Sequence, residues 1–165
     1  SYHFLFLYAQ APEHVRLLIL RRDGRAVAKS MTRGKRVKAW QGEGLQAYEQ
    51  AVGNWLRTNK LMDTLFSKVP RKHKLELRYE DFCRTPARII ECIDQAFGPG
   101  LNVDPEKALK IKAQSHNIGG SPSRLDQNKV SIQLDERWRE STTDEELAAF
   151  ERLAGPYNRK LGYAD

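Results

Sequence analysis

The chain has 165 residues, of which 40% are hydrophobic and 30% charged, as is ordinary for one globular domain with its own core. Lys and Arg outnumber Asp and Glu by 28 to 21, and the net charge of +7 favours an anionic partner: a nucleotide, a nucleic acid, an anionic polymer or a membrane surface. No apolar run approaches the roughly 18 residues of a membrane span. Two cysteines exclude a disulfide framework and favour a reducing, cytoplasmic setting.

The first predicted strand leads into a turn that is rich in arginine. Residues 17–20 form a short, continuous apolar run, typical of a strand that is buried on both faces in a parallel sheet. Gly24 breaks the run, and the residues after it predict a helix over 25–31 with Asp23 as its N-cap.

Helical periodicity dominates the next part of the chain. Residues 32–43 are basic and punctuated by glycine, which predicts a loop. Over residues 44–69 apolar side chains recur at steps of three and four, which predicts one or two amphipathic helices that end before Pro70.

A second strand and further helices are predicted downstream. Residues 74–82 alternate between apolar and polar side chains and predict a strand, and helices are expected to open after Thr85 and after Asp104. Residues 115–129 are polar and rich in Gly and Ser and predict a long loop, and Thr143 is expected to cap a last helix. This order of strands and helices predicts one α/β domain, a parallel sheet flanked by helices.

The turn after the first strand is a candidate phosphate site. A helix N-terminus attracts anions, and Arg22 and Ser30, eight residues apart, can face one another across the turn. The arginine offers a bidentate fork and the serine a hydroxyl, a combination that suits a phosphate. The residues equally allow a structural interpretation, in which Arg22 pairs with Asp23 or Glu80 and Ser30 caps or bonds back to the helix.

The same turn resembles a family motif. RRDGRAVAKS is similar to the strand–loop–helix that binds the 3′-phosphate in sulfotransferases that use 3′-phosphoadenosine 5′-phosphosulfate (PAPS). In that family an arginine ends the strand and a serine follows eight residues later, as Arg22 and Ser30 do here. Gly24 stands where the family more usually has proline, and we expect this departure only to loosen the turn.

Two further motifs follow in the family's order. LELRYEDFCRTPARIIECI resembles the second signature, a strand ending in Tyr-Glu-Asp before a capped helix. SHNIGGSPSRLDQNKVSIQLDERWRE is similar to the late His, Gly-x-Pro-x-Arg and Asp-x-x-Trp segment of bacterial and carbohydrate-type members, with Ser121 where asparagine is more common. The resemblance runs from about residue 12 to Tyr163 and so covers nearly the whole chain.

This resemblance implies a fold, a co-substrate and roles for particular residues. The fold would be the P-loop NTPase-like fold of sulfotransferases. PAPS would donate its sulfuryl group, without a metal, to a hydroxyl or amine of a small-molecule, carbohydrate or protein acceptor. Arg22, Ser30, Tyr79 and Arg124 would bind the co-substrate, and the catalytic residues are unknown.

Several of these residues also have a structural interpretation. Tyr79 is equally typical of a half-buried strand tyrosine, and Arg124 of a solvated loop arginine. His116 could act as a base, or it could hydrogen-bond locally, as loop histidines often do.

One part of the family pattern is absent from the chain. Nothing resembles the glycine-rich loop that binds the 5′-phosphosulfate and opens the family's fold. In the family this loop and the acceptor-activating base typically lie upstream of the segment that the chain resembles. We therefore expect an N-terminally truncated sulfotransferase, similar to the C-terminal two-thirds of one, that holds the 3′-phosphate end of the nucleotide and lacks much of the transfer apparatus.

Two other functions fit the same composition. In TRGKRVKAW, residues 32–40, basic side chains precede Trp40, which suits a non-catalytic nucleic-acid-binding module that tracks phosphates and stacks a base. A phosphotransferase of the nucleotide-kinase type would also have a parallel sheet with basic helix starts, but it needs the same missing phosphate loop.

Overall fold

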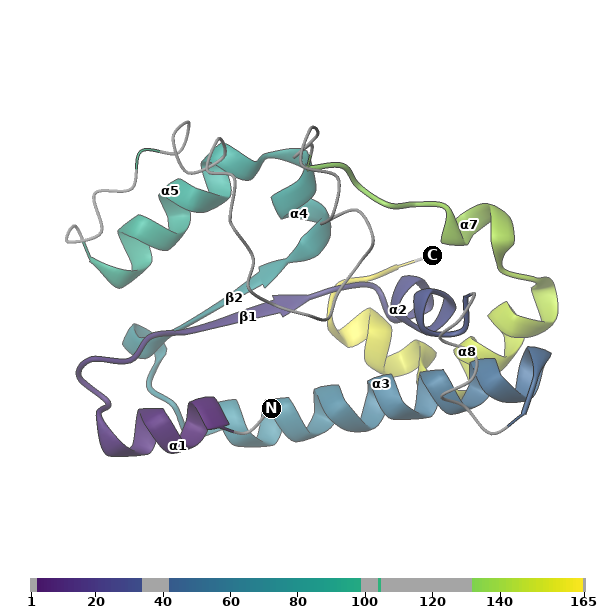
Figure 1. Ribbon diagram of the computed structural model, residues 1–165, viewed down its shortest axis with the longest axis horizontal. Coiled ribbons are helices and arrows are strands. Elements are labelled where there is room, and N and C mark those ends of the chain that lie inside the picture. The colour runs from purple at the N-terminus through teal and green to yellow at the C-terminus, as the bar shows by residue number, and fades with distance from the viewer. Residues whose placement is uncertain (1–2, 34–41, 99–103, 105–131, 165) are drawn as a thin grey trace. The chain divides into compact units, whose positions relative to one another are not determined.

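The chain forms a mixed α/β structure that is mostly helical (Figure 1). The structure, a computed structural model, describes residues 3–33, 42–98, 104 and 132–164. Its contacts divide the chain into a first unit, Ser1–Glu76 with Asp135–Asp165, and a second unit, Leu77–Leu134. The single domain expected from the sequence stays a prediction. In the described residues, no helix is long and apolar enough to cross a membrane.

Two strands, β1 (Leu17–Arg21) and β2 (Lys74–Arg78), pair in a small parallel sheet. The coarse prediction of an α/β chain with parallel strands is therefore confirmed. The described helices are α1 (His3–Gln10), α2 (Gly24–Met31), α3 (Gly44–Ser67), the 3-10 turn η2 (Arg71–His73), α4 (Tyr79–Arg84), α5 (Pro86–Phe97), α7 (Trp138–Ser141) and α8 (Asp144–Lys160).

The core of the first unit lies where α2, α3 and α8 meet. Small and aromatic side chains are buried together there: Ala28, Tyr48, Ala51, Val52, Trp55, Phe150 and Ala154. The α3 members recur at three- and four-residue steps, the spacing that places side chains on one face of a helix. The helical prediction for residues 44–69 is confirmed, as one continuous helix of 24 residues.

Strand β1 is buried on one face. Leu17 and Ile19 pack with Phe66 of α3, whereas Leu18 and Leu20 are 48% and 53% exposed. The prediction that this strand is buried on both faces is wrong. A short apolar run shows that a strand is favoured but does not show how many of its faces meet helices.

The second strand ends earlier than its sequence pattern predicts. β2 stops at Arg78, and Tyr79 begins α4, whose first turn contains Glu80 and Asp81. Acidic side chains in a first turn favour the helix through its dipole, which explains why the alternating pattern does not extend the strand. Thr85 then precedes α5 as predicted, and the apolar stripe of α5 is half-buried: Ile89, Ile90, Ile93 and Phe97.

Some predicted elements lie outside the described residues. These are the helix after Asp104, the loop over 115–129 and most of the loop over 32–43.

Gly24 lies where the start of α2 packs closely against α3 and α8. A Cβ at this position would stand 2.8 Å from Phe150 of α8 and 2.8 Å from the Trp55 ring of α3. The Gly24 N–H also donates to Asn158 Oδ1 at 3.0 Å, a bond that proline cannot make. Glycine therefore permits a tight junction here, rather than the looser turn expected from the sequence.

We predict that Gly24→Ala destabilises the protein, because the new methyl group overpacks the junction. The free energy of unfolding should fall by about 1–3 kcal/mol in urea denaturation. Gly53→Ala is the matched control, since its Cβ would meet open space in the interior of α3 and should leave stability unchanged or raise it by roughly 1 kcal/mol. Equal losses at both positions would contradict the packing argument.

Candidate functional site

The turn between β1 and α2 is closed by a network of buried side chains. Asp23 Oδ1 accepts a hydrogen bond from the Arg25 backbone N–H at 2.9 Å, which confirms the predicted N-cap. Asn158 of α8 accepts from the Gly24 N–H and donates through Nδ2 to Asp23 Oδ1 at 3.3 Å. The first two N–H groups of α2 are thus bound by the protein's own side chains, so an anion at this turn must use other donors.

Helix α8 holds the other end of α2 as well. Lys29, in the last turn of α2, places Nζ 2.6 Å from Glu146 Oε2, and both side chains are largely buried. Glu146 also completes a capping box with Thr143, which confirms the predicted cap of the last helix. An isolated helix of eight residues is too short to be stable in water, so the position of α2 depends on these contacts.

Arg25 has a structural role in this network. Its guanidinium lies 2.8 Å from Asp23 Oδ2, donates to the Ala164 carbonyl at 2.9 Å and stands 5.1 Å from the centre of the Trp138 ring. A buried guanidinium with these contacts holds the chain end and α7 against the turn.

Arg21 is the second structural arginine. It is 5% exposed and donates to Glu76 at 2.9 Å, to Asn59 at 2.7 Å and to Asp63 at 2.5 Å. These bonds connect β1 to β2 and to α3. Arg21 and Arg25 thus both pair with acidic side chains.

Asp63 and Tyr157 extend the Arg21 network into α8. The Tyr157 hydroxyl donates to Asp63 Oδ2 at 2.8 Å. Burial raises the pKa of the Tyr157 phenol, and its bond to the carboxylate raises it further. Burial also acts to raise the pKa of Asp63, but the hydrogen bonds from Tyr157 and Arg21 outweigh it and the net direction is down. Asp63 is therefore ionised and balances Arg21.

Arg22 differs from both neighbouring arginines. Its side chain is 24% exposed, donates to the Asp135 backbone carbonyl at 3.1 Å and lies 3.9 Å from the Asp135 carboxylate. Arg22 lies just after β1, which ends at Arg21, and just before Asp23, the N-cap of α2. The partner shown here is Asp135, whereas the carboxylate of Asp23 binds Arg25.

Ser30 lies on α2, the helix that follows the turn. It is half-buried in the last turn of α2, six residues after Gly24 and therefore about 9 Å along the helix axis. A phosphate that touches both Arg22 and Ser30 must lie beside α2 rather than on its N-terminal N–H groups.

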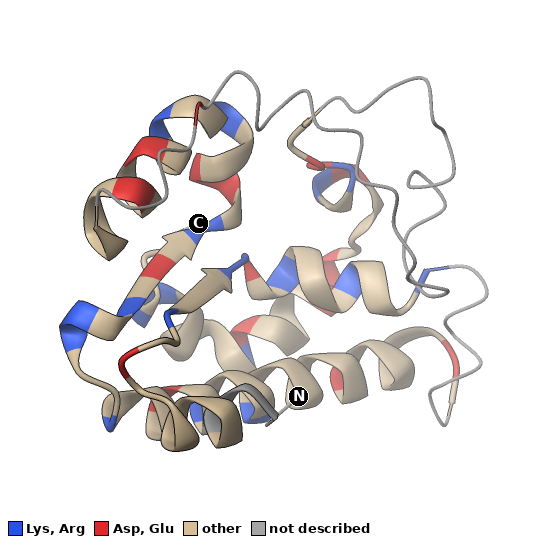
Figure 2. Ribbon diagram, turned by 60° about the vertical axis from the view of Figure 1, so that its left-hand side comes forward, with Lys and Arg blue, Asp and Glu red and all other residues tan. Residues whose placement is uncertain are grey.

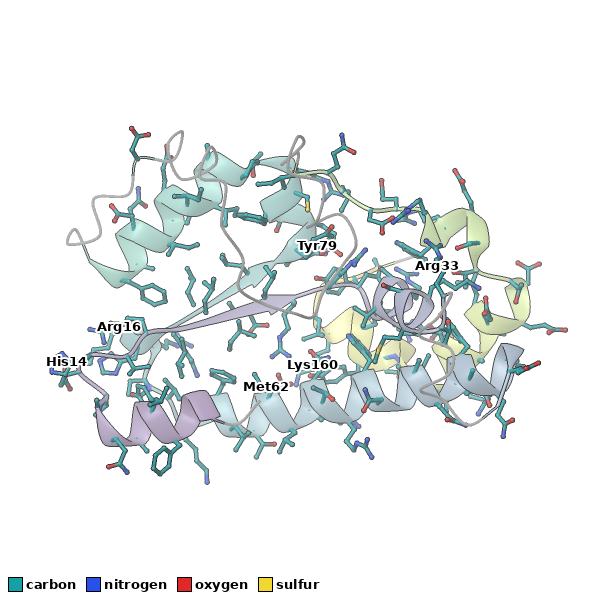
Figure 3. The ribbon with its side chains drawn as sticks, in the orientation of Figure 1. His14, Arg16, Arg33, Met62, Tyr79 and Lys160 are labelled. Atoms are coloured by element: carbon teal, nitrogen blue, oxygen red, sulfur yellow. The ribbon has the colours of Figure 1, made fainter. Side chains whose placement is uncertain are left out.

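The other two predicted co-substrate residues belong to other parts of the chain. Tyr79 belongs to the second unit, where its hydroxyl donates to the Gln133 carbonyl at 3.4 Å (Figure 3). Arg124 lies outside the described residues, as do His116 and Trp40.

Sequence reasoning missed Asn158 and Asp135. Asn158 is 2% exposed and falls four residues after Ala154 on the buried stripe of α8. The sequence signal for Asn158 is a polar residue at a position where the helical periodicity predicts a buried apolar one. Asp135 opens the predicted Asp-x-x-Trp motif, but nothing local in the sequence indicates that its backbone carbonyl faces Arg22.

The comparisons do not assign the chain to a known group. Models of protein families, curated proteins and solved structures gave no match. Within the described part of the chain, no group of three or more His, Cys, Asp or Glu side chains is placed to hold a metal ion. The two cysteines are half-buried free thiols. The functional argument therefore rests on the residues at the turn.

We predict that Asp135 titrates at about pH 2, below its ordinary value of 3.8. The main cause is the hydrogen bonding of its carboxylate to the Arg137 guanidinium, at 2.7 and 2.8 Å, and desolvation acts in the opposite direction. Because the folded pKa is depressed, this contribution to stability is present above about pH 4 and is lost as the pH falls toward 2.

Carboxyl NMR titration checks this value. Arg137→Gln should raise the pKa of Asp135 toward 3.8. Arg139→Gln is the matched control, because Arg139 bonds to Glu136 instead and its removal should leave the pKa of Asp135 unchanged. A wild-type pKa near 3.8 would contradict the electrostatic account.

Proposed function

We propose that the chain is part of a PAPS-dependent sulfotransferase with the P-loop NTPase-like fold, and that Arg22 and Ser30 bind the 3′-phosphate of the nucleotide. The observation that carries the proposal is the difference between three neighbouring arginines. Arg21 and Arg25 are buried and lie within 3 Å of their carboxylates, whereas Arg22 is 24% exposed, bonds to the Asp135 backbone carbonyl and is 3.9 Å from the Asp135 carboxylate.

Phosphate binding at this turn is chemically favourable. A phosphate offers Arg22 a bidentate, charge-assisted contact that is stronger than its bond to a neutral carbonyl. The nearby Asp135 carboxylate would repel the phosphate. Arg137, however, binds both oxygens of this carboxylate and offsets much of its negative charge. The Ser30 hydroxyl supplies a further donor along the helix.

The rest of the proposal follows from the resemblance of the motifs. Tyr79 and Arg124 would contact the co-substrate, and the transfer would be an in-line attack by an acceptor hydroxyl or amine on sulfur. Cations aimed at the charge that develops on the leaving nucleotide would stabilise the transition state. We place the protein in a reducing, cytoplasmic setting and assign no catalytic base.

Thermal unfolding with adenosine 3′,5′-bisphosphate tests this function. At about 100 times its Kd, the ligand should stabilise the protein by about 2.7 kcal/mol, or roughly 5–10 °C in Tm for a chain of this size. Adenosine 5′-monophosphate, which lacks the 3′-phosphate, should give a much smaller shift. Equal shifts from the two nucleotides would show that the assignment of the 3′-phosphate is wrong.

Substitutions test whether the change in Tm arises from nucleotide binding at Arg22 and Ser30. Arg22→Ala should weaken bisphosphate binding roughly 10- to 100-fold, the cost of a charge-assisted hydrogen bond, and Ser30→Ala should weaken it less. Arg57→Ala is the control, because Arg57 is exposed on α3 and bonds to Asn54. No response to the bisphosphate, together with salt-dependent binding of random oligonucleotides, would favour the nucleic-acid-binding module.

A further inference from the structure

A charged cleft lies within the first unit, on the side of β1 that carries Arg21. Its volume is about 560 Å³. The walls come from the two strands, the C-terminal half of α3, η2 and the end of α8, and in Figure 3 Lys160 lies between β1 and α3. Neither Arg22 nor Ser30 lines this cleft, so it is separate from the proposed 3′-phosphate site.

The cleft carries an excess of positive charge. Its lining includes four cations, Arg21, Arg71, Lys74 and Lys160, and two anions, Asp63 and Glu76. Arg21 pairs with both anions, and Lys160 lies 3.6 Å from Asp63 with 69% of its side chain exposed. Two positive charges are left over when the four cations are set against the two anions.

The excess lies mainly on Arg71 and Lys74, which pair with no carboxylate in the described residues. Lys74 Nζ donates to the Phe66 carbonyl at 2.5 Å, a neutral partner near the end of α3. Arg71 is exposed on η2, and within the described residues its guanidinium has no hydrogen-bond or ion-pair partner. Figure 2 shows basic positions on η2 and at the start of β2. These two side chains can therefore bind an external anion without breaking a buried ion pair.

Apart from Ser67, the remaining lining residues are apolar. Ile19, Phe66, Leu75 and Leu161 contribute hydrocarbon or aromatic surface beside the charged groups. A site with an apolar wall and convergent cations suits a ligand that has both an anionic head and an apolar body. An inorganic ion would use the charges but leave this apolar surface exposed to water.

We propose that this cleft binds an organic anion, with a sulfate, phosphate or carboxylate head on Arg71, Lys74 and Lys160 and an apolar body against Phe66 and Leu161. The head replaces water at the exposed cations, and the body covers the apolar wall. Arg21 lines the same cleft but is held by Asp63 and Glu76. This site does not depend on the proposed sulfotransferase function, because it uses none of the residues assigned to the nucleotide.

Calorimetric titration of the 165-residue chain with 2-naphthyl sulfate tests the proposal, with the neutral analogue 2-naphthol as the comparison. Arg71→Gln and Lys160→Gln should each weaken naphthyl sulfate binding about 5- to 10-fold, as expected for loss of one charge-assisted contact. 2-Naphthol should bind at least 10-fold more weakly than the sulfate to the unaltered chain. Both substituted side chains are exposed, so circular dichroism should show unchanged folding.

Lys60→Gln is the matched control. It makes the same change of charge on an exposed position of α3 outside the cleft, and the affinity for naphthyl sulfate should not change beyond twofold. A saturating concentration of adenosine 3′,5′-bisphosphate should also leave the affinity unchanged. Equal weakening by all three variants, equal binding of 2-naphthol, or competition by the bisphosphate would overturn the proposal of a separate anion site.

Discussion

The arrangement of the first unit depends on how α8 holds α2 at both ends. Asn158 bonds to the start of α2, through Gly24 and Asp23, and Glu146 bonds to Lys29 in its last turn. These two polar residues sit on the buried stripe of α8, where apolar residues would pack but could not satisfy the groups at the helix ends. An eight-residue helix gains its fixed position from these contacts rather than from its own propensity.

The three arginines at the turn between β1 and α2 have different roles. Strand β1 directs Arg21 to the same buried face as Leu17 and Ile19, and Arg22 follows the end of the strand. The first helical turn brings Arg25 back onto Asp23. Two of the three guanidiniums are therefore structural. Loss of Arg25 would leave the buried Asp23 carboxylate unbalanced, and loss of Arg21 would leave the partly exposed Asp63 and Glu76 without their shared partner. The third, on Arg22, lies at the surface beside α2, where the fixed helix also presents Ser30.

Local signals predicted local structure well. The N-caps at Asp23 and Thr143 and the long helix from residue 44 follow from capping chemistry and periodicity, which need no knowledge of the rest of the fold. The one-sided burial of β1 depends on which helices cover the sheet, and the carbonyl of Asp135 reaches Arg22 from 113 residues away. Such long-range partners leave no periodic trace in a single sequence. The sequence therefore names Arg22 and Ser30 as candidate ligand contacts but does not indicate the residues that support them.

The most direct test of this division of roles compares Arg21→Gln, Arg22→Gln and Arg25→Gln, with the unfolding free energy and the Kd for adenosine 3′,5′-bisphosphate measured on each. We predict that Arg21→Gln and Arg25→Gln each lower the unfolding free energy by about 2 kcal/mol and leave the Kd of the folded protein within about threefold. Arg22→Gln should raise the Kd at least 10-fold and change stability by less than about 0.5 kcal/mol. An Arg22 variant that loses stability but binds the bisphosphate normally would contradict the account.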